Sequence, residues 1–263
     1  IVVGADSDEI ANRVALLYEK INATVLITNH NSAELIKYAS NSFLAMRLSF
    51  VNELAGLCEK TGSDSRDVLH GMGLDSRIGS NFNSPGPGWG GSCFPKDTKA
   101  LQLIFENHGL SSPLIEATLE SNERTKRRIV DTLSDLAGGS LEGKIVGALG
   151  LAFKSETDDT RESPAVAVIT RLLSRGAQVR AYDPVVRSLA LEGLTIVSTP
   201  HEVAEKADVL VVLTEWKDFK SLAPEMFLKQ MSSKKVLDAR GVLEVNLWSE
   251  AGAELSRIGA KNA

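Results

Sequence analysis

The sequence has little of several residue types, and each shortage excludes a class of protein. Its 263 residues include two cysteines, Cys58 and Cys93, which are too few for a disulfide framework or for a zinc site without other ligands. Aromatic residues make up 5% of the chain, and no segment approaches the ~18 consecutive apolar residues of a membrane span. No segment resembles a signal peptide, so we expect a cytoplasmic protein without a membrane partner.

Positive charge is also in short supply. The 29 Lys and Arg residues are outnumbered by 34 Asp and Glu residues, and the net charge is -5. The basic residues are scattered, which argues against a nucleic-acid partner. With 43% hydrophobic and 24% charged residues, the composition is that of a soluble globular protein of about two domains. The chain begins at Ile1 without a methionine and enters an apolar run at once, so we expect it to be part of a longer protein.

Segments of different pattern predict an α/β fold. Residues 1–28 show strand, helix and strand patterns in turn, and one such βαβ unit cannot cover both faces of its own sheet. Residues 31–139 carry helical patterns, whereas residues 140–263 alternate short β-rich runs with helices. That alternation predicts a doubly wound, parallel sheet. The strands expected in it are 144–149, 178–182, 195–197, 209–214 and 235–237.

The helical segment opens with a long helix. Asn31 with Glu34 three residues later has the form of a capping box, and apolar residues follow at helical spacing until Gly62. The predicted helix has about 28 residues and a length of roughly 42 Å at 1.5 Å per residue. We interpret it as a strut between domains or as a dimer helix, whether or not it also carries a site.

The segment most informative about chemistry is 85–97, in which four glycines precede a cysteine. Glycines let a backbone approach a ligand closely, and Pro95 suits the first turn of a following helix. Cys93 would then lie at a helix N-terminus, where the helix dipole and the nearby Lys96 favour a nucleophilic thiolate. The alternative is a tight structural turn with a small buried cysteine. Cys58 lies on an apolar helical stripe and is interpreted as core.

A second candidate site lies on the long helix. Lys37 and Asn41 are four residues apart and share one face, so that an amine and an amide could stabilise an oxyanion. The alternative is that both are solvated surface residues. A cysteine hydrolase would also need a histidine partner, and none of the four histidines carries a flanking motif.

The third candidate is the loop after the first strand of the last segment. Residues 147–152 only weakly resemble a dinucleotide fingerprint and are followed by a polar insert, 153–163. Ligands of open α/β sheets bind beyond the carboxyl ends of the strands, where this insert must lie. Lys154 and Arg161 could hold phosphate there. Asp183, at the end of the next strand, could hold a ribose hydroxyl or form a turn.

Together these residues resemble the nucleotide-sugar dehydrogenase family, most closely its UDP-glucose 6-dehydrogenase branch. The matching motifs follow family order through nearly the whole chain: ELIKYASN at 34–41, DSRIG at 75–79, GWGGSCFPKD at 88–97, GLAFK at 150–154, DTRESP at 159–164, TEW at 214–216 and DAR at 238–240. The resemblance implies a remnant of an N-terminal NAD-binding Rossmann domain in 1–30 and a central helical dimerisation domain in 31–139. It implies a Rossmann-like C-terminal domain, which binds the UDP moiety, in 140–263.

The resemblance also implies an activity. The family oxidises the C6 alcohol of a nucleotide sugar to a carboxylate in two steps and reduces two NAD. In this branch UDP-glucose becomes UDP-glucuronate, a precursor in polysaccharide biosynthesis. Carried over by position, Cys93 would add to the C6 aldehyde, give a thiohemiacetal and later hold a thioester. Lys37 and Asn41 would stabilise the oxyanion, and Asp97 would assist the proton and water steps.

Further roles follow the same motifs. Arg77 would reach across a homodimer interface into the partner's substrate site. The residues expected around the sugar nucleotide are Phe82, Gly90, Phe94, Lys154 and Arg240, the last two at its phosphates. Those expected near NAD are Lys96 and Arg161. No metal is expected.

The sequence also departs from the family pattern. The Gly-x-Gly-x-x-Gly turn and the N-terminal catalytic Thr and Glu residues of the family are absent from it, so we expect the chain alone to bind NAD poorly and to be inactive. One alternative is a dehydrogenase of GDP-mannose or UDP-N-acetylmannosamine. Another is a non-catalytic, dimerising module that binds a sugar nucleotide.

Overall fold

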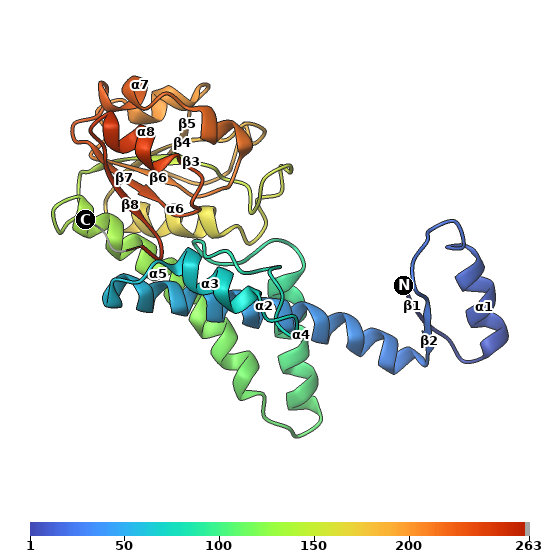
Figure 1. Cartoon of the computed structure of the whole chain (residues 1–263). Helices are drawn as coiled ribbons and strands as arrows, with labels where there is room; N and C mark the ends of the chain where they lie inside the picture. Colours follow the sequence, from blue (N-terminus) through green and yellow to red (C-terminus); the bar gives the residue numbers. More distant parts are fainter. Residues whose placement is uncertain (261–263) are drawn as a thin grey trace.

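The computed structural model describes residues 1–260, and its first unit is a small βαβ motif. Strands β1 (Val2–Gly4) and β2 (Leu26–Thr28) pair in parallel, and α1 (Asp8–Leu16) connects them. Figure 1 shows this unit standing apart from the rest of the chain, at the far end of a long helix. As the sequence predicts, one such unit leaves its apolar side chains uncovered. The exposed ones include Ile10, Leu16, Leu17, Ile21 and Leu26.

The long helix is α2 (His30–Thr61), which has 32 residues and a length of about 48 Å. The predicted capping box of Asn31 and Glu34 is wrong, because Asn31 lies inside the helix. Asn29 caps it instead, since its extended backbone lets the side-chain oxygen accept a hydrogen bond from Ser32 N at 2.8 Å. The helix ends as predicted at Gly62, in the left-handed conformation. Its first turns are largely exposed, and its buried positions begin at Ser42.

Three further helices surround the second half of α2. They are α3 (Ser65–Gly73), α4 (Phe94–Asn107) and α5 (Pro113–Leu136). Helix α2 packs against both α4 and α5. Its buried positions include Ala45 and Ala55, both fully buried, and such small side chains allow close packing.

The second sheet is parallel throughout and has the strand order β5-β4-β3-β6-β7-β8. Because the chain runs outward from β3 in one direction and from β6 in the other, a topological switch point lies between these two strands. The strands are β3 (Ile145–Leu149), β4 (Gln178–Tyr182), β5 (Leu194–Ile196), β6 (Val209–Val212), β7 (Lys235–Asp238) and β8 (Glu254–Arg257). The helices between them are α6 (Pro164–Ser174), α7 (Pro224–Leu228) and α8 (Val245–Glu250), with 3-10 turns η1 (Pro200–Ala204) and η2 (Lys217–Ser221).

This architecture confirms the predicted fold class and the doubly wound sheet. Strand β8 is the one that the sequence pattern did not indicate, because its Glu-Leu-Ser-Arg sequence is short and polar. Ser163 caps α6, since its hydroxyl accepts a hydrogen bond from Val166 N.

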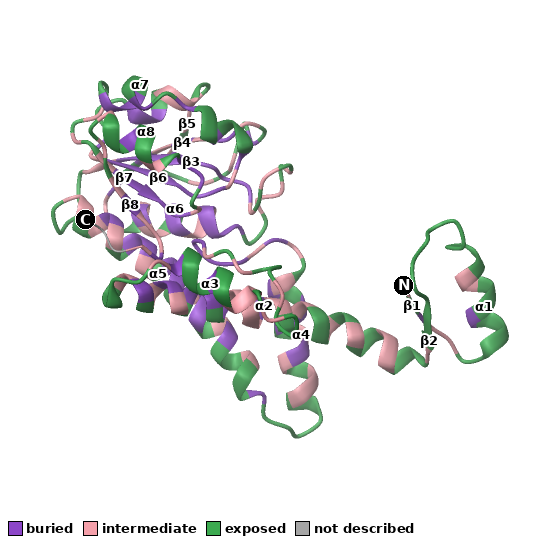
Figure 2. Cartoon of the chain, viewed as in Figure 1, coloured by how far each residue is buried: buried purple, intermediate pink, exposed green. Residues whose placement is uncertain are grey.

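One hydrophobic core joins the sheet to the helical part. The buried residues of the central strands pack with α6 and with Ile129 and Leu133 of α5. Figure 2 shows the buried residues concentrated in the sheet and where α2, α4 and α5 cross, whereas the βαβ unit is mostly exposed. Within residues 1–260, no helix combines the length and apolarity needed to cross a membrane.

Candidate functional site

A pocket of about 530 Å³ lies at the switch point of the large sheet. One wall comes from the carboxyl ends of three neighbouring strands, since Phe153 follows β3, Glu215 follows β6 and Arg240 follows β7. Ligands of doubly wound sheets bind in this position. The opposite wall belongs to the helical part and includes Leu48, Asn52, Phe82, Gly86, Gly88, Gly90 and Phe94. The pocket therefore lies between the two parts of the chain.

The glycines of segment 86–91 allow this close approach. A Cβ at Gly90 would overlap the carbonyl oxygen of Glu162 and lie 2.8 Å from Pro164 Cδ, while one at Gly91 would lie 2.8 Å from the ring of Phe153. Gly91 also has a φ of +82° and Gly88 one of +120°, which side chains disfavour. The loop is thus fitted against the 153–163 insert and Pro164, a close approach to protein rather than to the ligand that the glycines had led us to expect.

Cys93 is the N-cap residue of α4, and its side chain is exposed. The carbonyl of Cys93 accepts a hydrogen bond from Asp97 N at 2.9 Å. Cys93 is not among the residues that line the pocket, but the next residue, Phe94, and Gly90 of the preceding loop are. Cys58 is buried, as predicted for a core cysteine. The alternative of a small buried cysteine therefore does not describe Cys93.

Asp97 lies one turn along α4 from Cys93 and contacts both residues of the second candidate site, Lys37 and Asn41. Its carboxylate is 1% exposed and receives a hydrogen bond from Asn41 Nδ2 at 2.5 Å. Lys37 Nζ lies 3.1 Å from the same oxygen, and Lys96 Nζ lies 2.5 Å from the other. Lys37 and Asn41 are therefore directed at a common acceptor rather than solvated separately.

This arrangement determines the charge of Asp97. Burial opposes ionisation of the carboxyl group, but hydrogen bonds from Lys96, Asn41 and Lys37 outweigh it and lower the pKa of Asp97. The pKa of Lys96 is raised, mainly by the hydrogen bond to Asp97 and to a small extent by the nearby Cys93. The site therefore holds a buried anion between cations, one helical turn from the thiol.

The predicted substrate residues gather around the pocket. Phe82 has a left-handed φ of 57°, and its ring centroid lies 6.3 Å from that of Phe94. The Lys154 ammonium lies 5.4 Å from the Phe153 ring centroid and also lines the pocket. Aromatic faces and a cation thus meet at one opening, next to the glycine loop.

Arg240 is the buried cation of the pocket. Its Nε donates to Leu213 O at 3.0 Å and lies 3.1 Å from a carboxylate oxygen of Glu215. Burial lowers the pKa of Arg240, while Glu215 and Asp238 raise it. A guanidinium remains charged at neutral pH, so the pocket keeps a fixed positive group for an anionic ligand.

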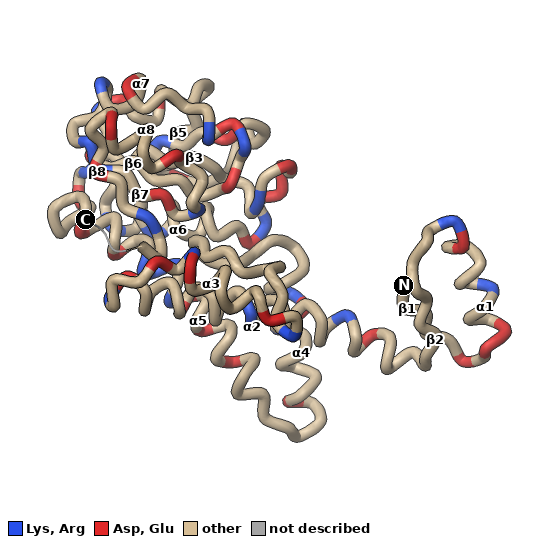
Figure 3. Tube along the Cα trace, viewed as in Figure 1, with Lys and Arg blue, Asp and Glu red and all other residues tan. Residues whose placement is uncertain are grey.

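Arg161 lies outside the pocket lining. Its Nη2 is 2.8 Å from an oxygen of Asp159, and this contact chiefly raises the pKa of Arg161. Cys93 contributes slightly to the same rise in pKa. Figure 3 shows Lys and Arg interspersed with Asp and Glu along the trace, without a basic stripe.

Arg77 is not brought to this pocket. It is highly exposed, pairs with Asp75 at 2.6 Å and lines a separate groove of about 640 Å³. The groove runs along α2 and α5 and contains several apolar side chains. They are Phe43, Met46, Phe50, Met72, Ile78 and Leu114.

Several residues that support the site were missed by sequence reasoning. Asn122 of α5 accepts a hydrogen bond from Trp89 N and donates one to Trp89 O, both at 2.9 Å, and Asn52 accepts one from Gly86 N. Arg47 donates to Ile78 O and Gly79 O and so fixes the turn beyond Arg77. These polar residues lie within helical patterns, and nothing in the sequence around them predicted the contacts.

Asp183 has a structural task. Its fully buried carboxylate accepts hydrogen bonds from the backbone N–H of Leu151, Ala152, Val185 and Val186, and from the indole of Trp216. The turn interpretation is therefore the correct one, because these five donors leave little capacity for a ribose hydroxyl. The carboxylate fixes the loops that follow β3 and β4.

The histidines do not supply a partner for Cys93. His30 pairs with Asp6, His70 of α3 lines a small separate cavity, His108 contacts Ile104 O, and His201 packs on the Phe227 ring. Within residues 1–260, no described histidine contact involves Cys93. The structure thus gives no support to a Cys-His hydrolase.

Comparisons with known proteins agree with this geometry. Residues 31–124 match the central domain of the UDP-glucose/GDP-mannose dehydrogenase family, and residues 147–245 match the UDP binding domain of the same family. A UDP-glucose 6-dehydrogenase of Rhizobium meliloti (strain 1021) is 41% identical over 267 residues, which cover 98% of this chain and 61% of that protein. The chain thus spans about three fifths of the length of this relative.

Solved structures show the same fold. A UDP-glucose dehydrogenase from Pyrobaculum islandicum superposes with a TM-score of 0.88 at 37% identity, covering 99% of this chain and 58% of that one. A UDP-D-ManNAc dehydrogenase from Pyrococcus horikoshii gives a TM-score of 0.86 at 28% identity, covering 100% of this chain and 60% of that one.

Proposed function

Because the chain belongs to the UDP-glucose/GDP-mannose dehydrogenase family, we propose that its pocket binds UDP-glucose and that Cys93 serves the oxidation of C6 to a carboxylate. The product would be UDP-glucuronate. The observation that carries the proposal is the placement of an exposed thiol at the N-terminus of α4, one helical turn from the buried Asp97 carboxylate and next in sequence to Phe94, which lines the pocket. The relatives named UDP-glucose 6-dehydrogenase support this substrate.

The pocket has the chemistry of a sugar nucleotide site. Phosphate groups bind to cationic side chains. Lys154 and Arg240 line the pocket from the loops after β3 and β7 and could bind the phosphates. An apolar and aromatic lining near Phe82 suits a base and a sugar face. Its volume of about 530 Å³ is in the range of small-molecule sites.

The proposed steps on Cys93 conserve atoms and electrons. The thiolate sulfur attacks C6 of the aldehyde formed by the first oxidation, and the carbonyl oxygen becomes an oxyanion. Lys37 and Asn41 would stabilise that charge, and protonation gives the thiohemiacetal. In the second oxidation the hydroxyl group loses its proton and C6 loses a hydride to the acceptor of that oxidation, which gives the thioester. Water then adds to C6, the C–S bond breaks, and the thiolate and the carboxylate are released.

Asp97 is proposed to position the other groups. Its lowered pKa makes it a weak base, so it would serve by fixing Lys37 and Asn41 and by orienting water rather than by removing a proton unaided. The two side chains reach Asp97 from α2, and Cys93 precedes it on α4. Catalysis would therefore depend on the packing of these two helices.

The family resemblance implies NAD as the hydride acceptor, but the described residues do not form a dinucleotide cradle. The one glycine of the βαβ unit, residues 1–28, is Gly4 at the end of β1, and a Cβ there would lie 2.7 Å from Ala33, so α2 closes the space where a ligand would approach. Asp6 in the same turn carries a negative charge and pairs with His30. Contacts of Lys96 and Arg161 with this cofactor stay predictions. The 263 residues alone are expected to be inactive.

We also propose a homodimer through α2 and α5. The groove along these helices exposes Phe43, Phe50 and Leu114 beside Arg77. Apolar faces of this kind usually mark an interface in soluble proteins. A second copy seated there would cover the groove and bring Arg77 toward the partner's substrate.

Two alternative functions are compatible with the same geometry. One is the oxidation of a different sugar nucleotide, because a UDP-D-ManNAc dehydrogenase has a similar fold. The other is a binding module without catalysis. Calorimetric titration of the chain with UDP, UDP-glucose, UDP-N-acetylmannosamine, GDP-mannose and NAD separates these substrates and tests the cofactor at the same time.

The proposal predicts tightest binding of UDP-glucose and negligible binding of NAD. Lys154→Met should weaken UDP binding by about tenfold or more, because it removes a charge-assisted phosphate contact. Lys229→Met, at an exposed site near α7, serves as the control. In the protein that carries this sequence, Cys93→Ala should abolish oxidation, and retained turnover would show that Cys93 is not the nucleophile. Equal binding of UDP and GDP-mannose would contradict the UDP-glucose assignment.

A further inference from the structure

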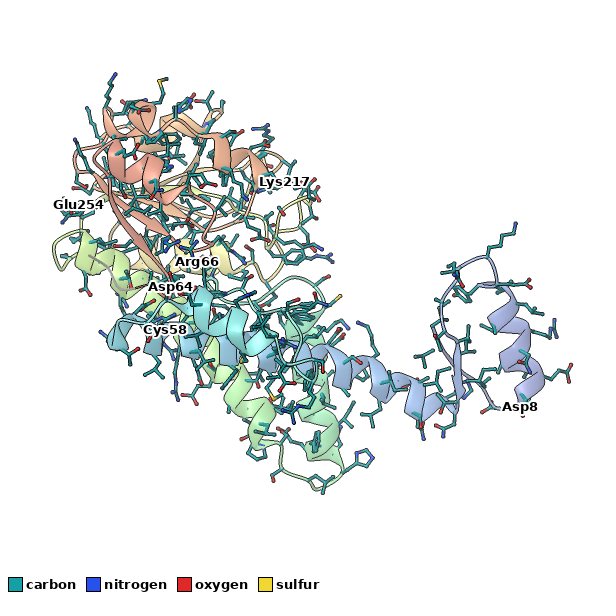
Figure 4. All side chains as sticks on the ribbon, in the orientation of Figure 1. Asp8, Cys58, Asp64, Arg66, Lys217 and Glu254 are labelled. Carbon is teal, nitrogen blue, oxygen red and sulfur yellow. The ribbon has the colours of Figure 1, made fainter. Side chains whose placement is uncertain are left out.

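A second, smaller cavity of about 140 Å³ lies behind the pocket, at the seam between the helical part and the large sheet. Figure 4 labels Asp64 and Arg66 on the helical side of this seam. Its lining is unusually rich in arginine. Arg66 comes from the first turn of α3, Arg240 from the loop after β7, and Arg257 from the end of β8.

The walls of this cavity are fixed to each other. Ser65 N donates to Gly259 O at 2.8 Å, and Gly259 N donates to a carboxylate oxygen of Glu59 at 2.8 Å. A Cβ at Gly259 would overlap the Ser65 side chain, so the strand-to-loop turn is fitted against α3. The cavity is therefore a property of the fold and not of one side-chain rotamer.

Among the residues that the structure describes, the guanidinium of Arg257 has no hydrogen-bond acceptor. Its side chain is only 13% exposed, and its one ion pair within residues 1–260 is with Asp64, whose oxygen lies 3.7 Å from Arg257 Nη2. This distance is too long for a hydrogen bond. A mostly buried cation without hydrogen bonds from its donors is costly unless an anion or water satisfies it.

The surrounding charges favour an anion. The lining residues carry three positive groups, Arg66, Arg240 and Arg257, and one negative group, Asp64. Arg66 Nε is also 3.7 Å from Asp64, so two guanidinium groups share one distant carboxylate. Burial lowers the pKa of Arg257 and the positive Arg66 lowers it further, whereas Asp64 and Asp238 raise it.

We propose that this cavity binds one small oxyanion of the size of inorganic phosphate, held between Arg257 and Arg66. A volume of about 140 Å³ equals four or five waters at about 30 Å³ each, which suits a phosphate and excludes a nucleoside diphosphate. The site is separate from the pocket assigned to the sugar nucleotide and does not depend on that assignment.

Occupancy of the two sites is expected to be coupled. Ser84, Pro85, Arg240 and Gly241 line both the cavity and the larger pocket. An anion that draws on the Arg240 charge from one side would weaken the field that this group offers on the other. Bound phosphate should therefore lower the affinity for UDP, and by linkage UDP should lower the affinity for phosphate by the same factor.

The test is calorimetric titration of the chain with inorganic phosphate, with and without saturating UDP. We expect one phosphate per chain in both conditions, with weaker binding when UDP is present. Arg257→Met should reduce the affinity by about tenfold or more, because it removes a charged donor pair. Arg66→Gln should reduce it less, since this side chain is 61% exposed. The control is Arg124→Gln, on the exposed face of α5.

The outcomes separate this proposal from the proposed function. Loss of all phosphate binding under saturating UDP would show that phosphate enters only the larger pocket and would overturn the second site. An unchanged affinity in Arg66→Gln and Arg257→Met would overturn it as well. If the chain binds no UDP, the phosphate affinities of Arg66→Gln and Arg257→Met, measured without UDP, still test the second site. If Arg257→Met does not fold, the exposed Arg66→Gln decides.

Discussion

Replacement of Gly90 by alanine tests how tightly the glycine loop is held against the sheet. A Cβ there would lie well inside 3.0 Å of the Glu162 carbonyl oxygen and 2.8 Å from Pro164 Cδ. Both obstacles resist movement, because one is backbone and the other opens α6, whose cap Ser163 is itself fixed by a hydrogen bond to Leu151 O. Overpacking of this kind costs about 1–3 kcal/mol, and we expect about 3 kcal/mol because a backbone segment must shift.

Thermal unfolding measures this cost. At about 2–4 °C per kcal/mol for a chain of this size, Gly90→Ala should lower the melting temperature by about 6–12 °C. Gly71→Ala is the matched control, because nothing lies within 4 Å of a Cβ at that helical position. It should stabilise the chain by about 0.5–1 kcal/mol. If Gly90→Ala unfolds within 1 °C of the wild type, the close approach between the loop and the insert is refuted.

Two other perturbations address the charge cluster and the exposed groove. Burial of Asp97 is outweighed by its donors, so its pKa is lowered and its ionised form stabilises the fold above about pH 4, a contribution that is lost as the pH falls through the lowered pKa. In denaturant unfolding, the free energy of unfolding of Asp97→Asn should therefore be about 1–2 kcal/mol below that of the wild type at neutral pH, and the difference should shrink in acid. A difference that does not change with pH would contradict this. Phe50→Asp places a charge in the groove and should give monomers by sedimentation, whereas Leu103→Asp, at an equally exposed site on α4, should not; a monomeric wild type would count against the dimer.

Much of the fold could be predicted because its signals are local. Short β-rich runs predicted five strands of the large sheet, and Gly62 predicted the end of the long helix. The start of α2 was misplaced by two residues, because both Asn29 and Asn31 are suitable caps and only the backbone conformation decides between them. Strand β8 was missed because its partner β7 supplies the stability that its own residues do not indicate.

The site was predictable where chemistry depends on neighbours in sequence. Cys93, Lys96 and Asp97 lie within one helical turn, so their proximity follows from the spacing. The convergence of Lys37 and Asn41 on Asp97 could not be read from spacing, because it depends on how α2 and α4 cross. The same holds for Asn122, which binds the loop at Trp89 across the helical bundle.

The structure also shows why one interpretation had to remain open at the sequence level. An aspartate after a strand can bind a ligand or organise a loop, and the sequence around Asp183 suits both. Only the five donors gathered around its carboxylate decide in favour of the loop. Asp238 is similar, since it accepts hydrogen bonds from the backbone of Arg240, Gly241 and Leu243. Both aspartates thereby fix loops that lead to residues of the pocket lining.

The central claim is that Cys93 is a reactive thiol at the margin of a sugar nucleotide pocket, and its alkylation rate tests this claim most directly. The chain is treated with iodoacetamide near neutral pH, with and without UDP-glucose, and the buried Cys58 serves as the internal reference. The account predicts rapid modification of Cys93, slow modification of Cys58 and protection of Cys93 by UDP-glucose. A Cys93 that reacts no faster than free cysteine, or at the same rate when UDP-glucose is bound, would contradict it.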